Sequence, residues 1–288
     1  MKIAIISGKG GTGKTTISTN LAYVLSLKHK VMLIDADVEE PNSHLFFNIK
    51  FEREISVNLK KPVIDMKKCT LCRKCVEVCQ FGALIAFPKS IFVYENLCKG
   101  CGACKLICPT KAISERSTEL GIIKIGSISE NLKYAMGLLN IGELSGVKII
   151  RELKNNIPSD IEITIIDAPP GASCPVVEAL VDTDFAILVT EPTPFGLSDL
   201  KMAVSIIEEM KIPSGIIVNR YTKGSDIIHN FAKEKNIPII STIFFDREIA
   251  KYYSKGEIFS KHIDKWQNEF IEIYDKIQRL TNETNSNN

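Results

Sequence analysis

The sequence is organised around one glycine-rich stretch, which reads Gly8-Lys9-Gly10-Gly11-Thr12-Gly13-Lys14-Thr15-Thr16. The apolar run Ile3–Ile6 before it predicts a buried strand, and the apolar spacing from Ile17 to Leu25 predicts the buried face of a helix. Strand, glycine loop and helix are the context that the pattern G-x-x-x-x-G-K-[ST] requires. Its glycines let backbone N–H groups turn toward an anion at the helix N-terminus. The stretch therefore predicts a phosphate-binding loop, with Lys14 reaching the β- and γ-phosphates and the Thr15 hydroxyl coordinating Mg²⁺.

The same loop satisfies a competing pattern. Gly8, Gly10 and Gly13 also match G-x-G-x-x-G, the dinucleotide-binding fingerprint, and acidic residues follow roughly 20 positions later at Asp35 and Asp37. That interpretation leaves the lysine and two threonines after the last glycine unexplained. A glycine turn without a ligand has no need of them either. We therefore favour phosphate binding.

Composition limits the class of protein. The chain has 288 residues, of which 45% are hydrophobic and 24% charged, as in an ordinary globular protein, and its length fits about two domains. A strand begins within three residues of the N-terminus, so we expect no signal peptide, and no apolar run reaches the ~18–20 residues that span a bilayer. We therefore expect a cytoplasmic protein with no membrane insertion. The net charge of +2 gives no reason to predict a nucleic-acid partner.

Eight of the nine cysteines fall between positions 69 and 108, where they form two copies of C-x₂-C-x₂-C-x₃-C that begin 29 residues apart. Clustered cysteines in a cytosolic chain indicate metal more often than disulfides. This spacing is that of bacterial ferredoxins with two 4Fe–4S clusters, in which the fourth cysteine of each run binds the other cluster. We predict one cluster on Cys69, Cys72, Cys75 and Cys108, and a second on Cys98, Cys101, Cys104 and Cys79.

The cysteine-rich segment is predicted to be an insert, residues 60–115, in a domain formed by residues 1–59 and 116–288. Zinc is the main alternative metal, but two runs of four cysteines exceed what tetrahedral zinc sites need. Gln80 stands where the ferredoxin pattern has proline, which bears on local geometry and cluster potential. The insert holds ten basic and four acidic residues, a net charge of +6, which leaves −4 for the remainder. This basic character fits neutralisation of anionic clusters, a solvated face or a docking surface for an acidic electron donor.

Two strands are predicted to end in acidic residues. Val31–Ile34 leads into Asp35-Ala36-Asp37, and Ile161–Ile166 leads into Asp167-Ala168-Pro169-Pro170-Gly171. The carboxyl ends of parallel strands line the crevice in which doubly wound sheets bind ligands. Both segments could be plain turns, but beside a phosphate loop we predict that Asp37 positions Mg²⁺ or water. Asp167 is predicted to hold Mg²⁺ through water, and Gly171 to offer a free N–H to a γ-phosphate.

The remaining chain alternates predicted strands and helices. A strand at Gly215–Val218 ends in Asn219-Arg220, and we predict that the Asn219 amide contacts adenine N6 and N7. Cys174 is interpreted as a small buried residue near a helix start, with a ligand or redox role as the alternative. A helical stripe runs from Ile263 to Ile277, and the polar residues 281–288 are expected to be a disordered tail. Further strands are predicted at Ile122–Ile125, Ala186–Thr190 and Ile237–Phe244.

Taken together, the segments K-G-G-T-G-K-T-T, D-A-D, D-A-P-P-G and V-N-R resemble the MinD/Mrp-like ATPases with a deviant Walker A motif. These are relatives of the nitrogenase iron protein and the partition ATPases. The cysteine runs resemble, more narrowly, members with an inserted ferredoxin domain. The resemblance implies an α/β fold, a doubly wound and mostly parallel P-loop NTPase sheet with an inserted α+β bacterial-ferredoxin-like domain.

The resemblance also implies a homodimer that sandwiches two ATP molecules. Lys9 matches the signature lysine that reaches the partner's nucleotide, and Asp37 matches the residue that positions the attacking water. Unlike the iron protein, the core offers only Cys174 as a ligand, so the clusters are assigned to the insert. The basic membrane-targeting tail of MinD is absent. The implied nucleotide-binding residues are Gly8, Lys9, Gly10, Gly11, Thr12, Gly13, Lys14, Thr15, Thr16, Gly171, Asn219 and Arg220. The implied Mg²⁺ ligands are Thr15, Asp37 and Asp167, and the catalytic residues are Lys9, Lys14, Asp37 and Asp167.

Two functions follow from this set of motifs. The first is ATP-gated electron transfer through two 4Fe–4S clusters to a redox partner protein. The alternative is ATP-dependent delivery of an iron–sulfur or related metal cofactor to an apo-metalloprotein. Because eight complete cysteine ligands argue against a labile cluster, the sequence favours electron transfer. A positioning ATPase with a structural or redox-sensing ferredoxin is a third reading. In each case we expect hydrolysis of ATP by positioning and charge neutralisation, slow without a partner.

Overall fold

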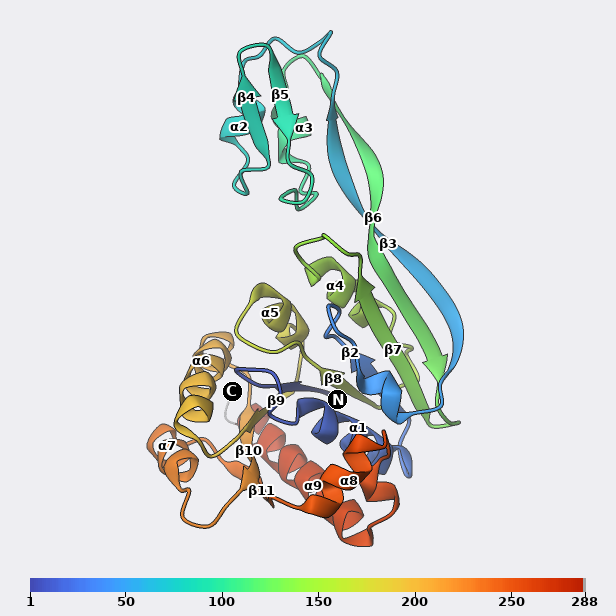
Figure 1. Cartoon of the computed structure of the whole chain (residues 1–288), viewed down its shortest axis with the longest axis vertical. Helices are drawn as coiled ribbons and strands as arrows, with labels where there is room; N and C mark the ends of the chain where they lie inside the picture. The colour runs from blue at the N-terminus through green and yellow to red at the C-terminus, as the bar shows by residue number, and fades with distance from the viewer. Residues whose placement is uncertain (287–288) are drawn as a thin grey trace.

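A nine-stranded sheet, in the order β11-β10-β9-β1-β8-β2-β7-β6-β3, forms the centre of the computed structural model, which describes residues 1–286 (Figure 1). Seven neighbouring strands run parallel. Their apolar residues are buried on both faces, as parallel strands covered by helices on each side require. These strands are β1 (Lys2–Ile6), β2 (Val31–Asp35), β7 (Leu132–Leu139), β8 (Ile163–Asp167), β9 (Phe185–Thr190), β10 (Ser214–Tyr221) and β11 (Ile239–Phe244).

Helices cover both faces of the sheet, and each face has its own apolar core. One layer contains α1 (Lys14–Ser26), α8 (Arg247–Ser254), the short η2 (Phe259–Lys261) and α9 (Asp264–Ser286), with η1 (Ser43–Phe46) packed beside α1. The other layer contains α4 (Val147–Asn155), α5 (Cys174–Leu180), α6 (Pro194–Met210) and α7 (Ile227–Lys235). The doubly wound, mostly parallel α/β sheet predicted from the sequence is therefore confirmed.

The C-terminal helix confirms one prediction and corrects another. The stripe from Trp266 to Ile277 packs into the core beside α1. The expectation of disorder from residue 281 is wrong for residues 281–286, because α9 continues without a break to Ser286. Residues 287 and 288 lie outside the described residues. Within residues 1–286, no helix combines the length and apolarity needed to cross a bilayer.

The antiparallel edge of the sheet extends into a long ribbon. Strands β3 (Lys50–Ile64) and β6 (Ile113–Ser127) pair along their whole length. Only the base of β6, from Gly121 to Ser127, also pairs with β7, so the outer part of the hairpin leaves the sheet as a twisted two-stranded arm (Figure 1). The sequence predicted only the short apolar part of β6, because charged residues interrupt the apolar alternation elsewhere.

The cysteine-rich segment folds at the tip of this arm. It contains α2 (Lys74–Glu77), the hairpin β4 (Leu84–Phe87) and β5 (Ser90–Val93), and α3 (Ala103–Ile107). A small core that includes Cys75, Leu84 and Ile91 holds these elements together. We call residues 65–112 the cysteine unit. The boundaries predicted at residues 60 and 115 fall inside the two strands of the ribbon, and the division into domains stays a prediction.

Candidate nucleotide and cysteine sites

The glycine-rich loop joins β1 to α1 in a conformation that depends on its glycines. Gly11 and Gly13 have φ values of 80° and 100°, which favour glycine, and Gly13 is the N-cap of α1. A Cβ on Gly8 would lie 2.2 Å from the carbonyl oxygen of Asp199, so α6 packs directly against the loop. Lys14 is buried in the first turn of α1. The loop therefore places backbone N–H groups and one buried cation at the helix N-terminus.

Asn219 of β10 holds this loop in place. Its Nδ2 donates to the carbonyl oxygen of Thr12 at 2.8 Å, and its Oδ1 accepts from the N–H of Arg220 at 3.0 Å. A Cβ on Gly13 would come within 2.2 Å of Nδ2, so this contact needs glycine. The adenine contact of Asn219 stays a prediction, whereas its contact with the loop is a role that the sequence did not indicate. Arg220 forms an ion pair with Glu191 at 2.6 Å.

Two buried carboxyl groups lie side by side beneath the loop. Asp35 and Asp167 are in register on the adjacent strands β2 and β8. Asp35 Oδ2 accepts hydrogen bonds from the Ser43 N–H at 2.9 Å and the Ser43 hydroxyl at 2.6 Å, whereas Asp167 Oδ1 is buried without a hydrogen-bond partner among residues 1–286. Burial, followed by the charge of Asp35, raises the pKa of Asp167 to about 7, although Lys14 opposes the shift. Asp167 therefore offers an unused oxygen to a cation.

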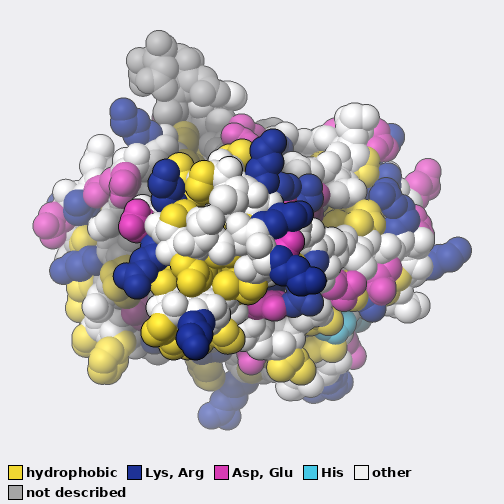
Figure 2. All heavy atoms as spheres, turned by 90° about the horizontal axis from the view of Figure 1, so that it is seen from above, with side chains coloured by type: hydrophobic (Ala, Val, Ile, Leu, Met, Phe, Trp, Pro, Cys, Tyr) yellow, Lys and Arg dark blue, Asp and Glu magenta, His cyan; other side chains and the backbone are white. Residues whose placement is uncertain are grey.

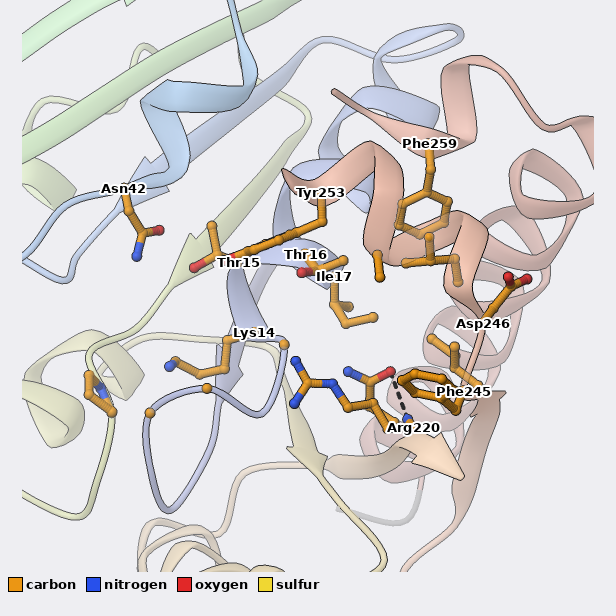
Figure 3. Close-up of a pocket in the computed structure, with 18 of the residues that line it drawn as sticks. Lys14, Thr15, Thr16, Ile17, Asn42, Arg220, Phe245, Asp246, Tyr253 and Phe259 are labelled. Carbon is orange, nitrogen blue, oxygen red and sulfur yellow. Dashed lines mark hydrogen bonds between the residues drawn. The ribbon is translucent and has the colours of Figure 1, made fainter. Parts of the chain in front are cut away.

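A cavity of about 350 Å³ opens beside the loop (Figure 3). Burial and the neighbouring Asp35 charge raise the pKa of Asp37, which lines it, to about 6. The sequence did not identify the apolar wall formed by Phe244, Phe245 and Tyr253, which follows the last strand into α8. Predicted site residues that line the cavity are Gly10, Gly11, Gly13, Lys14, Thr15, Thr16, Asp37, Asn219 and Arg220. Predicted residues outside its lining are Gly8, Lys9, Thr12, Asp167 and Gly171.

The prediction of a free N–H at Gly171 is wrong. That N–H donates to the carbonyl oxygen of Ser7 at 3.0 Å, because the loop after β8 closes against the end of β1. Lys9 lies close by and is partly exposed. The Ser7 hydroxyl donates to the Lys9 carbonyl at 2.6 Å, which fixes the backbone but leaves the role of its ammonium group a prediction.

The two predicted sets of cysteines line two separate pockets in the cysteine unit. One is lined by Cys69, Cys72, Cys75 and Cys108, and the other by Cys79, Cys98, Cys101 and Cys104, in each case with three cysteines from one run and one from the other. Backbone N–H groups donate to sulfur in both pockets: Ala112 to Cys108 at 3.3 Å, and Gly100 to Cys98 at 3.4 Å. Such hydrogen bonds tune the potential of iron–sulfur clusters.

A single metal ion and a 4Fe–4S cluster require different arrangements of the cysteines. Among residues 1–286, no group of three or more His, Cys, Asp or Glu side chains is gathered closely enough to hold a single metal ion. A 4Fe–4S cube takes four thiolates around its corners and not at one point, so the ligation of clusters by these cysteines stays a prediction. Cys174 is exposed at the start of α5, which corrects the expectation that it is buried.

The outer face of the cysteine unit is apolar and basic. Within the cysteine unit, Phe87, Phe92 and Leu106 are exposed, Leu106 by 87%. Figure 2, which views the molecule from this end, shows apolar side chains interspersed with Lys and Arg. The structure thus retains the three interpretations of the basic insert.

Comparison with known proteins places this site in a family. Residues 3–259 match the CobQ/CobB/MinD/ParA nucleotide binding domain. An uncharacterized protein of Methanocaldococcus jannaschii is 35% identical over 269 residues, which cover 92% of this chain and 93% of that protein's length. The iron-sulfur cluster carrier protein of Aquifex aeolicus is 26% identical over 88% of this chain and 60% of its own length. The septum site-determining protein MinD of Pyrococcus horikoshii, solved with Mg-ADP, has a TM-score of 0.61 at 20% identity, with 97% and 96% of the chains covered.

The raised carboxyl pKa values predict pH-dependent stability of the ligand-free protein. Between about pH 4 and pH 7 the folded chain binds more protons at Asp37 and Asp167 than the unfolded chain, because their folded pKa values, about 6 and about 7, exceed the ordinary 3.8. The contribution of these groups to the free energy of unfolding therefore falls as the pH rises through that window. Urea denaturation at a series of pH values measures the free energy of unfolding. In Asp167→Asn this free energy should fall less steeply with pH than in the unaltered protein. The same pH dependence in both proteins would contradict the raised pKa of Asp167.

Lys14→Ala is expected to weaken ATP binding at least 30-fold, roughly the effect of removing a cation worth ~2 kcal/mol from a charged contact. Isothermal titration calorimetry measures the affinity. Lys28→Ala is the matched control, because Lys28 is exposed beyond the end of the same helix. Tight ATP binding by the Lys14 variant would show that the loop binds its ligand in another way.

Proposed function

Because the chain belongs to the CobQ/CobB/MinD/ParA nucleotide-binding family, we propose that it is an ATPase whose nucleotide cycle acts on iron–sulfur clusters held by the cysteine unit. The observation that carries the proposal is that one chain joins a glycine loop with a buried lysine to two four-cysteine pockets. Each part has its own chemistry, and the continuous ribbon between them gives a physical route for coupling.

The residues beside the loop fit a magnesium nucleotide. The unpaired Asp167 Oδ1 and the Thr15 hydroxyl supply oxygen donors of the kind that Mg²⁺ prefers. A bound Mg²⁺ would neutralise phosphate charge. Lys14 holds the phosphates, and Asp37, at the cavity, orients a water molecule and accepts its proton when ionised. The raised pKa of Asp37 to about 6 leaves it mainly ionised at neutral pH.

The relatives favour delivery of clusters over electron transfer. One relative is named an iron-sulfur cluster carrier protein. We therefore place delivery of an iron–sulfur cluster to an apo-metalloprotein first, which reverses the order that the cysteine count alone favoured. Electron transfer to a redox partner remains the second candidate, because each pocket has a full set of four cysteines and amide donors to sulfur.

A single preparation separates the two functions. The protein is purified without oxygen, and we expect about eight irons per chain, four for each cluster. An apo-ferredoxin is then added with or without Mg-ATP, and cluster transfer is followed by the visible spectrum of the re-isolated acceptor. Delivery predicts that ATP accelerates transfer. A nucleotide-dependent shift of the reduction potential without transfer would favour electron transfer. If nucleotide changes neither the transfer rate nor the reduction potential, the proposal is wrong.

Cysteine variants provide the matched control for that experiment. Cys72→Ser or Cys101→Ser, each in a different pocket, should lower the iron content by about half. Cys174→Ser should leave it unchanged, because Cys174 lies in α5 outside the cysteine unit. Loss of iron in the Cys174 variant would indicate that Cys174 is a cluster ligand and that a cluster lies outside the cysteine unit.

The proposed homodimer with ATP at its interface yields a further test. Lys9→Ala should keep ATP binding, because Lys9 does not line the cavity of its own chain, but should lose hydrolysis that depends on protein concentration. Steady-state phosphate release at several protein concentrations measures this. A rate equal to that of the unaltered protein would mean that Lys9 does not act across an interface.

A further inference from the structure

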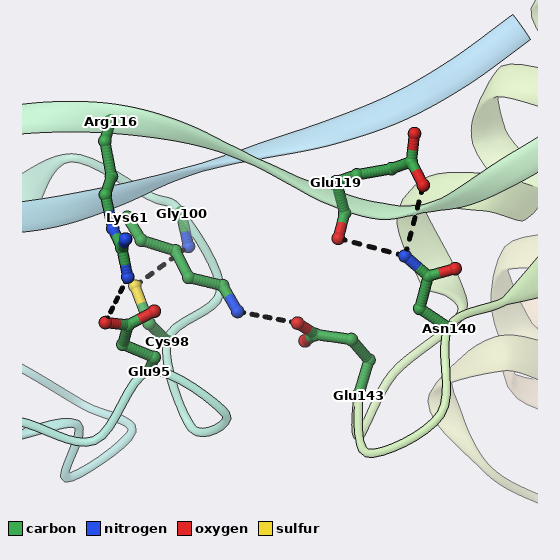
Figure 4. Close-up of polar contacts among 8 residues, drawn as sticks. All are labelled: Lys61, Glu95, Cys98, Gly100, Arg116, Glu119, Asn140 and Glu143. Atoms are coloured by element: carbon green, nitrogen blue, oxygen red, sulfur yellow. Dashed lines mark hydrogen bonds and ion pairs between the residues drawn. The ribbon is translucent and has the colours of Figure 1, made fainter.

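A buried ion pair joins the ribbon to the loop between β7 and α4. Lys61 of β3 is only 2% exposed, and its Nζ lies 2.6 Å from Oε1 of Glu143 (Figure 4). Glu143 belongs to residues 140–146, the β7–α4 loop. A buried lysine whose partner is removed is left as an uncompensated charge. The pair therefore ties the ribbon to this loop at one defined place.

The β7–α4 loop is in turn fixed to the nucleotide cavity. Val38, which follows the cavity residue Asp37, accepts a hydrogen bond from the N–H of Leu139 at 2.8 Å. Its side chain fills the space beside Gly146, the last residue of the loop, and beside Gly137 in β7: a Cβ on Gly146 would come within 2.1 Å of it, and one on Gly137 within 2.6 Å. A displacement of Asp37 and Val38 cannot leave the loop where it is, because close-packed contacts of this kind do not compress.

The other end of the ion pair adjoins one cysteine pocket. Lys60 and Pro62, on either side of Lys61, line the pocket of Cys79, Cys98, Cys101 and Cys104. A Cβ on Gly100 would lie 3.0 Å from Leu59 and 3.3 Å from the carbonyl oxygen of Lys60, so the cysteine loop rests on this part of the ribbon. Glu95 and Arg116 form a second ion pair across the same junction (Figure 4).

We propose that Lys61 and Glu143 are a positioning pair that transmits the nucleotide state from Asp37 and Val38 to the Cys98 pocket. The inference rests on the proposed function, since it supposes that nucleotide acts on the clusters. Beyond that function, the inference specifies that the Cys98 pocket responds to nucleotide and that the β7–α4 loop transmits the response. The pocket of Cys69 lies farther along the ribbon, beside Ile64, and Lys60 and Pro62 are not among the residues that line it.

Hydrogen exchange of the full, cluster-loaded protein tests the pair. With a non-hydrolysable ATP analogue, the unaltered protein should show changed exchange in residues 139–146 and in residues 98–104. In Glu143→Gln and Lys61→Met, the change in residues 139–146 should persist, and the change in residues 98–104 should fall at least about fivefold, the lower end of ordinary coupling between sites. ATP-stimulated cluster transfer should fall with it, while ATP hydrolysis stays within about twofold.

Three further variants make the result specific. Lys61→Glu combined with Glu143→Lys should restore the response. Lys61→Met combined with Glu143→Leu removes both charges and should fold even where a single variant does not, but without the response. Glu178→Gln breaks the 2.8 Å pair with Arg151 inside the ATPase domain and should leave the response intact.

The outcomes distinguish the role of the Lys61–Glu143 pair from the proposed coupling between nucleotide and clusters. A normal response of residues 98–104 in Glu143→Gln and in the double apolar variant would overturn the role of the pair and leave the proposed function standing. An unaltered protein in which nucleotide changes neither residues 98–104 nor cluster transfer would overturn the coupling as a whole. Loss of the response in the Glu178 control as well would show that any broken ion pair abolishes it, which would also overturn the role of Lys61 and Glu143.

Discussion

The parallel register of β2 and β8 places two carboxyl groups, Asp35 and Asp167, side by side in the protein interior. Two such groups cannot both ionise there without compensation. Ser43 donates two hydrogen bonds to Asp35, and the charge of the buried Lys14 opposes the rise in the pKa of Asp167. The segment after β2 supplies Ser43, and the glycine loop places Lys14 at the start of α1. Among residues 1–286, the Asp167 Oδ1 atom is left without a hydrogen-bond donor, which is why we propose it as a ligand of Mg²⁺.

The second organising feature is that no flexible linker connects the cysteine unit to the rest of the chain. Both of its connections are strands of one continuous ribbon, hydrogen-bonded from Lys50 to Ile64. Additional contacts between Lys148 and the carbonyl oxygen of Asn58, at 2.5 Å, and between Asn140 and Glu119 fix the ribbon to α4 and to the loop before it. The ribbon therefore holds the cysteine unit at a set distance from the rest of the chain.

Local sequence predicted the parts of the site that depend on local geometry. The glycine loop needs φ values that glycine adopts, and each cysteine run encloses a pocket through short spacings, so Gly13 and Cys98 could be placed from their neighbours alone. Contacts between distant segments could not be placed in this way. The N–H of Gly171 is taken by Ser7, and the amide of Asn219 by Thr12, across 207 residues in the second case. The ribbon was missed for the same reason, since β3 and β6 pair across the whole insertion and charges dilute their alternation.

Strand β3 is also the outermost strand of the sheet, which has a consequence for self-association. An open strand edge invites pairing with another chain and can lead to fibres. Here the edge carries Lys50, Glu52, Arg53 and Glu54 at its base and Pro62 near the cysteine unit, all of which oppose the addition of a further strand. Growth of the sheet from molecule to molecule is therefore disfavoured, even though the arm presents a long backbone edge to its surroundings. A neutral, apolar arm of the same length would lack these charges and this proline, and its edge would be more open to pairing with another chain.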